Sequence, residues 1–121
     1  MDMEKVSFES YCRINGHDEF LEWLVTLPKK DSAKLLRLIE ETEKQGLLIA
    51  QRMKWVKQID KNLYELRSKV GSNIQRAIYF HVVDGRYVIT HGFTKKTAKT
   101  PRKEILCAKA IREEWFTHED F

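Results

Sequence analysis

The chain has 121 residues, of which 42% are hydrophobic and 33% are charged. This length suffices for one modest core, so residues 1–121 are expected to form a single domain. No uncharged apolar stretch is long enough to cross a bilayer, and the first residues lack the basic-then-apolar order of a signal peptide. The two cysteines, Cys12 and Cys107, indicate neither a disulfide framework nor a metal site and are expected to be buried. A reducing cytoplasm is the expected location.

The formal net charge of +4 is unevenly distributed along the chain. Residues 67–112 contain 11 basic and two acidic side chains, a balance of +9, whereas the remainder has 11 basic and 16 acidic side chains, a balance of −5. Such polarity suits a polyanionic partner, and nucleic acid is the commonest one. The alternative is an uneven surface charge without a function.

Apolar periodicity predicts the elements of the first half. Residues 6–11 alternate between apolar and polar types, which indicates a first strand. From Asp18 the period changes to that of a helix, which Pro28 interrupts. A second helix is expected over residues 31–45, with Gly46 as its C-terminal stop. The residues expected to be buried on these two helices are Phe20, Trp23, Leu24, Leu27, Leu35, Leu36, Leu38 and Ile39.

The second half is expected to form three antiparallel strands and a helix. The strands cover residues 62–68, 73–83 and 87–93, and Asp84-Gly85 is a strong hairpin signal between the last two. The helix starts near Pro101, and residues 117–121 are expected to fray. Residues 47–60 fit either a short strand or a packed loop. The order β-α-α-β-β-β-α predicts an α+β domain, with helices packed on one face of a mainly antiparallel sheet.

A basic loop joins the last predicted strand to the last predicted helix. It carries Lys95, Lys96 and Lys99, and Thr100 and Pro101 follow it. Threonine before a helix can cap a free N–H, and proline is favoured at the first helical position. A basic loop beside a helix N-terminus is a suitable site for a phosphate anion. The alternative is a solvated lysine turn.

Strand alternation places further charged residues on one face of the sheet. Glu65 and Arg67 point the same way, and Arg76 shares its face with apolar neighbours. An unpaired buried charge is costly, so Arg76 must reach the end of the sheet or a groove. Glu65, Arg67 and Arg76 beside the basic loop could hold a phosphodiester. The alternative is a structural ion pair between Glu65 and an arginine, which would leave the second arginine free.

The residues also limit the chemistry. No Cys, His, Asp or Glu cluster has metal-ligand spacing, and no motif for a cofactor is present, so neither is expected. His91 can transfer a proton or can be a hydrogen-bonded packing residue. The reaction that remains is attack of an RNA 2′-hydroxyl on the adjacent phosphate. It needs a base, an acid and cationic stabilisation, and arginines and lysines supply the last of these.

Three segments together resemble the phage-derived, Gp49-like HigB branch of the RelE/HigB toxin superfamily. They are Leu63-Tyr64-Glu65-Leu66-Arg67, the run from Asn73 to Phe80, and the run from His91 to Pro101 with Glu104, Ile105 and Ala108. The resemblance implies a RelE/ParE-like fold and the toxin of a type II toxin–antitoxin pair. It also implies cleavage of mRNA in the ribosomal A site by 2′-hydroxyl attack without a metal, a cognate helix-turn-helix antitoxin, and no membrane partner.

The resemblance also implies roles for individual residues. Arg76 matches the strand arginine that holds the scissile phosphate, and Arg67 matches a basic residue that closes the preceding strand. This chain departs from RelE, which has lysines where Leu63 and Glu65 stand and a tyrosine near the position of Leu106. The base could therefore be Glu65 or His91, and the acid Lys96 or Lys99. The candidate RNA contacts outside this catalytic set are Lys95, Arg102, Lys103 and Lys54.

Two other functions are compatible with the same sequence. ParE toxins share the architecture but inhibit DNA gyrase by binding, without chemistry. An RNA-binding protein that does not cleave its ligand is the other alternative, and it predicts steeply salt-dependent binding without cleavage products.

Overall fold

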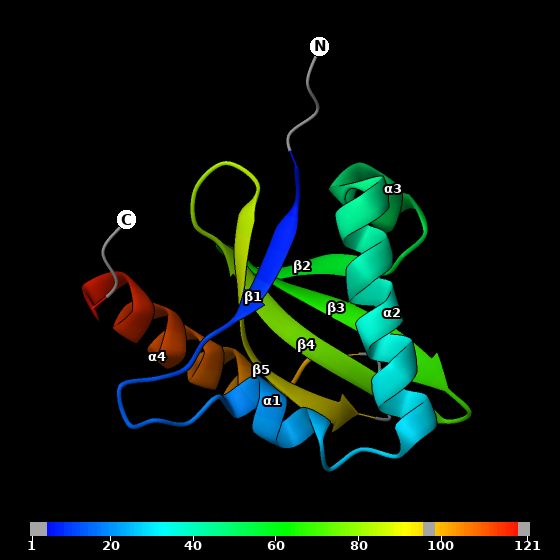
Figure 1. Ribbon diagram of the computed structural model, residues 1–121, viewed down its shortest axis with the longest axis horizontal. Coiled ribbons are helices and arrows are strands. Elements are labelled where there is room, and N and C mark those ends of the chain that lie inside the picture. The colour runs from blue at the N-terminus through cyan, green and yellow to red at the C-terminus, as the bar shows by residue number, and fades with distance from the viewer. Residues whose placement is uncertain (1–4, 96–98, 119–121) are drawn as a thin grey trace.

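The computed structural model describes residues 5–95 and 99–118, which form a five-stranded sheet with helices on both faces (Figure 1). The elements in chain order are β1 (Ser7–Ser10), α1 (Glu19–Leu24), α2 (Lys29–Gln45), α3 (Leu47–Arg52), β2 (Val56–Asp60), β3 (Leu63–Val70), β4 (Asn73–His81), β5 (Arg86–Lys95) and α4 (Arg102–His118). The strand order is β1-β5-β4-β3-β2. The pairings β2–β3, β3–β4 and β4–β5 are antiparallel, whereas β1 runs parallel to β5, so the sheet is mixed.

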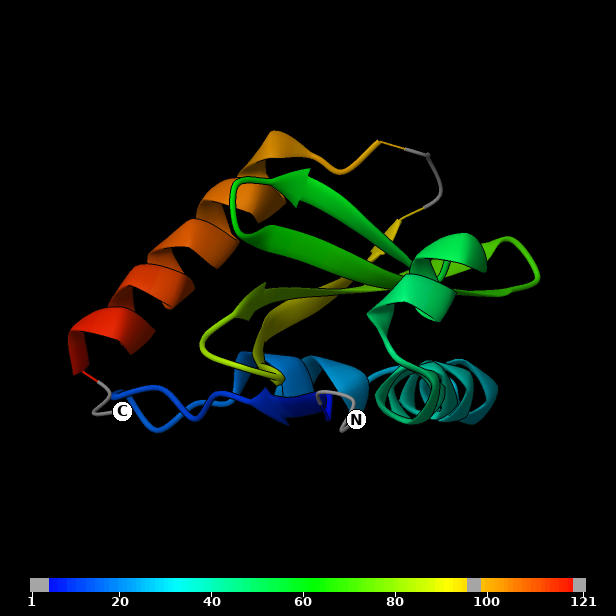
Figure 2. The same cartoon turned by 90° about the horizontal axis from the view of Figure 1, so that it is seen from above.

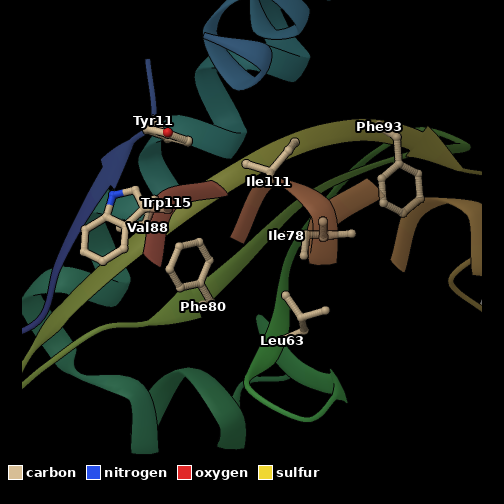
Figure 3. Close-up of a cluster of buried hydrophobic side chains, with 9 residues drawn as sticks. Tyr11, Leu63, Ile78, Phe80, Val88, Phe93, Ile111 and Trp115 are labelled. Atoms are coloured by element: carbon tan, nitrogen blue, oxygen red, sulfur yellow. The ribbon is translucent and has the colours of Figure 1, made fainter. Parts of the chain in front are cut away.

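The sheet has α4 on one side and α1 and α2 on the other (Figure 2), and a hydrophobic cluster lies on each face. On one face α4 contributes Ala108, Ile111 and Trp115, which pack with residues such as Phe80 (Figure 3). The rings of Phe80 and Trp115 meet edge to face with centroids 5.8 Å apart. On the other face α1, α2 and α3 contribute Phe20, Leu24, Leu35 and Ala50.

The prediction that helices cover one face is therefore wrong. Residues 77–80 of β4 are all buried, and successive strand residues point to opposite faces, so both faces need a cover. Among the helices that the structure describes, none is long and apolar enough to cross a membrane.

The other differences from the sequence analysis are local. The ambiguous residues 47–60 form both α3 and β2, and the expected hairpin turn is confirmed, with Asp84 at φ 51°. Leu36 is 46% exposed rather than buried. Both cysteines are exposed, which contradicts their expected burial. Residues 117 and 118 belong to α4 rather than to a frayed end, and residues 119–121 lie outside the described residues.

A carboxylate of α4 fixes the segment that follows β1. Glu114 Oε2 accepts a hydrogen bond from the Tyr11 hydroxyl at 2.8 Å, and Glu114 Oε1 accepts one from Arg13 Nη2 at 3.0 Å. The backbone N–H of Ile14 also donates to this carboxylate. The Arg13 guanidinium, followed by the Tyr11 hydroxyl, lowers the pKa of Glu114 to about 2. The ionised carboxylate therefore holds the two segments together.

Gly92 of β5 permits the close approach of α1. A Cβ atom at this position would overlap the six-membered ring of Trp23. Gly92 pairs with Ala77 of β4, so a small residue also lies beside it in the sheet. The glycine in the His91-Gly92-Phe93 segment is therefore required for helix–sheet packing.

Replacing Glu114 by Gln should weaken the fold in a pH-dependent way. The pKa of Glu114 is lower in the folded chain than its ordinary value of 4.5, so its stabilisation is complete above that pH and disappears as the pH falls towards 2. Urea unfolding of both proteins between pH 7 and pH 2 should show a stability difference that shrinks over this window. The neighbouring exposed Glu113→Gln is the matched control and should show no such convergence.

Gly92→Ala should lower the free energy of unfolding by about 1–3 kcal/mol, the usual range for an overpacked core. In a strand free of this contact, alanine would instead stabilise slightly, because it loses less backbone entropy on folding. Combining Gly92→Ala with Trp23→Leu should cost less than the sum of the single changes, measured by denaturant unfolding. Additive losses would show that the indole ring is not the obstacle.

Candidate nucleic-acid interface

A fully buried ion pair lies where β3 and β4 pair in the sheet. Arg76 Nη1 lies 3.3 Å from Glu65 Oε1, and the two side chains are 0% and 1% exposed. The Thr100 hydroxyl donates to Glu65 Oε2 at 2.6 Å and accepts from Arg76 Nη1 at 3.3 Å. The ion-pair alternative is thus the observed arrangement, and Arg76 presents no surface to a phosphate.

The hydroxyl of Thr100 does not cap α4, contrary to the sequence-based expectation. The helix begins at Arg102, and the backbone N–H of Glu104 donates to the carbonyl of Pro101 at 3.1 Å. Thr100 instead completes the buried pair, because each oxygen of a buried carboxylate needs a partner. These hydrogen bonds connect the end of the basic loop to the middle of the sheet.

His91 forms a second polar contact between the sheet and α4. Its Nε2 lies 3.0 Å from Glu104 Oε1 and its Nδ1 lies 3.1 Å from the Thr90 hydroxyl. Burial lowers the pKa of His91, and the nearby Glu104 carboxylate only partly opposes this effect. A neutral imidazole fits if Nε2–H donates to Glu104, and the single hydrogen of the Thr90 hydroxyl then goes either to Nδ1 or to the carbonyl of Ile78, which also lies 3.1 Å away. Within residues 5–95 and 99–118, no three His, Cys, Asp or Glu side chains are placed to hold a metal ion.

An open cationic cavity of about 250 Å³ lies at the end of β3. It is lined by Lys54, Arg67, Ser68, Lys69 and Ile74. Lys69 and Lys95 both have Ile74 as their Cα partner, in β3 and β5 respectively, so the three side chains share one face of the sheet. This face is the one that α4 covers further along the strands. Among the residues that the structure describes, no acidic side chain lines the cavity, so its field favours an anion.

A second surface cavity, of about 330 Å³, lies beside the start of α4. Lys57 and Lys99 line it, together with Gln58, Ile59, Thr100 and Ile105. Lys57 is the Cα partner of Glu65, so it lies in the row of residues next to the buried pair. Because Thr100 is hydrogen-bonded to Glu65 and Arg76, the neighbouring Lys99 lies on the same side of the sheet as Lys57.

The basic excess of residues 67–112 divides into two groups. Arg86 pairs with Glu9 at 2.7 Å, Lys109 pairs with Asp60 at 3.2 Å, and Arg112 donates to the carbonyls of the β2–β3 turn. These side chains, like Arg76, hold elements together. Among the described residues, the cations of this segment whose side chains form neither an ion pair nor a hydrogen bond are Arg67, Lys69, Lys95, Lys99, Arg102 and Lys103.

The structure thus separates the predicted site residues. Arg67, Lys54, Lys95 and Lys99 remain as accessible or partly accessible cations, and Arg102 and Lys103 are exposed in the first turn of α4. Lys96 lies outside the described residues. Glu65, Arg76 and His91 are buried and engaged in polar contacts.

Sequence reasoning missed the partners that close these contacts, Thr100 and Glu104. It also gave no site role to Lys69, although its spacing two residues after Arg67 places both on one face of β3.

Fold and surface together define a small α+β protein that carries open cationic cavities on one face of a mixed sheet. Residues 22–113 match the family model described as "Phage derived protein Gp49-like", so the chain belongs to this toxin-like family. A comparison with curated proteins gives no match.

Removing the arginine of the buried pair should destabilise the fold. Arg76→Met leaves the Glu65 carboxylate buried without its counter-ion, a change that typically costs about 3–5 kcal/mol. The double variant Glu65→Leu/Arg76→Met should recover much of this loss, because apolar residues of similar volume often replace a buried pair without penalty. Denaturant unfolding of the single and double variants measures the difference.

Equal losses in the single and double variants would contradict this account of the pair. The prediction also affects activity assays. If an Arg76 variant is destabilised as expected, its loss of activity would be explained by unfolding and would not place Arg76 in the active site. Thr100→Ser, which keeps the hydroxyl, is a matched control for the third member of the cluster and should change stability little.

Proposed function

We propose that the protein is the toxin of a type II toxin–antitoxin pair and that it binds and cleaves mRNA on the ribosome. Membership in a toxin-like family supports the first part of the proposal. One observation carries the second part: Lys54, Arg67 and Lys69 line a single cavity in which the described part of the chain places no acidic side chain. Arginine and lysine side chains in such a cavity suit the phosphates of a polyanion.

The proposed reaction needs no group beyond RNA and protein. The 2′-oxygen of one nucleotide attacks its own 3′-phosphorus, the bond to the 5′-oxygen of the next nucleotide breaks, and a 2′,3′-cyclic phosphate forms. The proton of the 2′-hydroxyl leaves to a base, and the departing 5′-oxygen gains a proton. Arg67 and Lys99 would stabilise the charge that grows on the phosphate, which is the largest contribution that fixed cations make to such a step.

Three residues that the sequence offered for catalysis have a structural role in this proposal, namely Glu65, Arg76 and His91. Glu65 is neither base nor acid, because its two oxygens bind Arg76 and Thr100. His91 is held between Thr90 and Glu104 and is 7% exposed. The proposal therefore assigns charge stabilisation to the partly accessible Arg67 and the exposed Lys99 and leaves the two proton carriers unassigned.

The burial of Glu65 and His91, the two candidate bases, favours a second candidate function, that of an RNA-binding protein that does not cleave its ligand. Such a protein needs the cations but not a base or an acid. It would block translation by occupying the mRNA, with an affinity that falls steeply as salt rises. The two candidates differ in one observable, the appearance of new RNA ends.

The proposal includes a cognate antitoxin of the helix-turn-helix kind. The unpaired cations at the end of β3 would attract an acidic element of that partner, and its binding would cover the surface that RNA needs. Co-expression of the product of the adjacent small gene should then relieve growth arrest.

Induced expression in a bacterium, followed by mapping of mRNA 5′ ends, tests the proposal. Wild-type protein should stop growth and create new ends within translated codons. Arg67→Gln should reduce cleavage by about 10²-fold, the usual effect of removing one preorganised charge-stabilising group. Lys61→Gln is the matched control, since it removes the same charge at the opposite end of β3 and should cleave normally.

The outcomes separate the candidates. Growth arrest with intact mRNA, together with salt-dependent RNA binding by the purified protein, would replace cleavage by the second candidate. Growth arrest with intact mRNA, no RNA binding and inhibited DNA supercoiling would instead support a ParE-like gyrase inhibitor and refute the proposal.

A further inference from the structure

A groove of about 590 Å³ runs between α2 and the residue that precedes β2. Its lining includes the half-buried indole of Trp55 and, from α2, Lys34, Arg37, Leu38 and Glu41. The groove has an aromatic wall, an aliphatic floor and two cationic side chains. Trp55 and Leu38 also pack against the hydrophobic core, but neither the core nor the proposed reaction accounts for the two cations beside them.

The groove adjoins the cationic cavity at the end of β3. Trp55 follows Lys54, which lines that cavity, and the carbonyl of Trp55 accepts a hydrogen bond from the N–H of Arg67 at 2.8 Å. On the side of α2, the Lys34 ammonium donates to the backbone carbonyl of Lys69. The groove and the cavity are therefore connected through two residues of β3, Arg67 and Lys69.

The indole is held in place before any ligand arrives. The backbone N–H of Trp55 donates to the carbonyl of Ala50 at 2.9 Å, so both polar backbone groups of this residue are fixed. The side chain also packs against the hydrophobic cluster that α2 and α3 share. A pre-positioned aromatic ring loses little conformational freedom on binding.

The charges around the groove select the kind of ligand. Lys34 and Arg37 line the groove, and Lys54, Arg67 and Lys69 line the adjoining cavity. The acid in the groove, Glu41, accepts a hydrogen bond from Gln45 at 2.9 Å, one helical turn away. An aromatic ring beside a row of cations is the arrangement with which proteins bind single-stranded nucleic acid.

We propose that this groove seats one base of the RNA strand, stacked on Trp55, while the adjoining cavity holds a neighbouring phosphate. The inference rests on the proposed function and specifies where a base, as opposed to the backbone, contacts the protein. Stacking on an aromatic side chain contributes about 1–3 kcal/mol per base, which corresponds to a factor of about 5 to 150 in affinity.

Fluorine NMR of the whole protein labelled with 5-fluorotryptophan tests this inference. The chain has three tryptophans, and Trp55→Phe identifies the resonance of Trp55. Hexauridylate and an abasic oligonucleotide of the same length and backbone are the probes. Hexauridylate should shift the Trp55 resonance and leave those of Trp23 and the buried Trp115 in place, whereas the abasic probe should bind without that shift.

Affinities measured by fluorescence polarisation complete the test. Trp55→Leu should weaken binding of hexauridylate about tenfold and leave binding of the abasic probe unchanged, while Trp55→Phe should keep most of the affinity. Arg67→Gln should weaken both probes, because it removes a phosphate contact.

Each other result overturns the inference in a distinguishable way. Hexauridylate that binds through Arg67 without shifting the Trp55 resonance would refute the base site and leave the proposed function intact. Equal losses for both probes in Trp55→Leu would assign Trp55 to the fold. Failure of the wild-type protein to bind either probe would refute both the base site and the proposed RNA-binding function.

Discussion

The cluster of Glu65, Arg76 and Thr100 is the interaction on which the second half of the chain depends. Two opposite charges lie out of water in the middle of the sheet, and burial of such a pair is tolerated only when its polar atoms find partners. The Thr100 hydroxyl supplies one of them from outside the sheet. Because α4 begins two residues later, the same contact sets where that helix starts and where the basic loop returns to the sheet.

This cluster also shapes the electrostatics of the surface. The carboxylate of Glu65 neutralises Arg76 at close range, so the central arginine adds little to the external field. The positive potential comes instead from Arg67, the cross-strand partner of Arg76, and from Lys69 and Lys95, which lie nearer the strand ends. The charge excess seen in the sequence is therefore partly used inside the fold, and the cations that could contact a polyanion are those that form no ion pair among the described residues.

Local patterns predicted the elements whose structure depends on local contacts. Turn residues and periodicity gave the two hairpins, the long helix α2 and the last helix. The parallel pairing of β1 with β5 and the second helical layer depend on contacts distant in the chain, which periodicity does not encode. At the site, alternation put Glu65 and Arg76 on one face, but it could not show that the loop would cover them, because Thr100 has equally good local use as a helix cap.

Each residue of the segment His91-Gly92-Phe93 has a structural role in the fold. His91 reaches Glu104 of α4, Gly92 makes room for Trp23 of α1, and Phe93 joins the hydrophobic cluster beneath α4. Three consecutive residues thus connect the sheet to both helical layers, and each requirement follows from packing alone. This segment therefore serves the fold, whereas the activity proposed above would depend on cations such as Arg67, which forms no ion pair within the described residues. Membership in the family and retention of the activity are consequently separate questions, and substitutions at the unpaired cations address the second without disturbing the first.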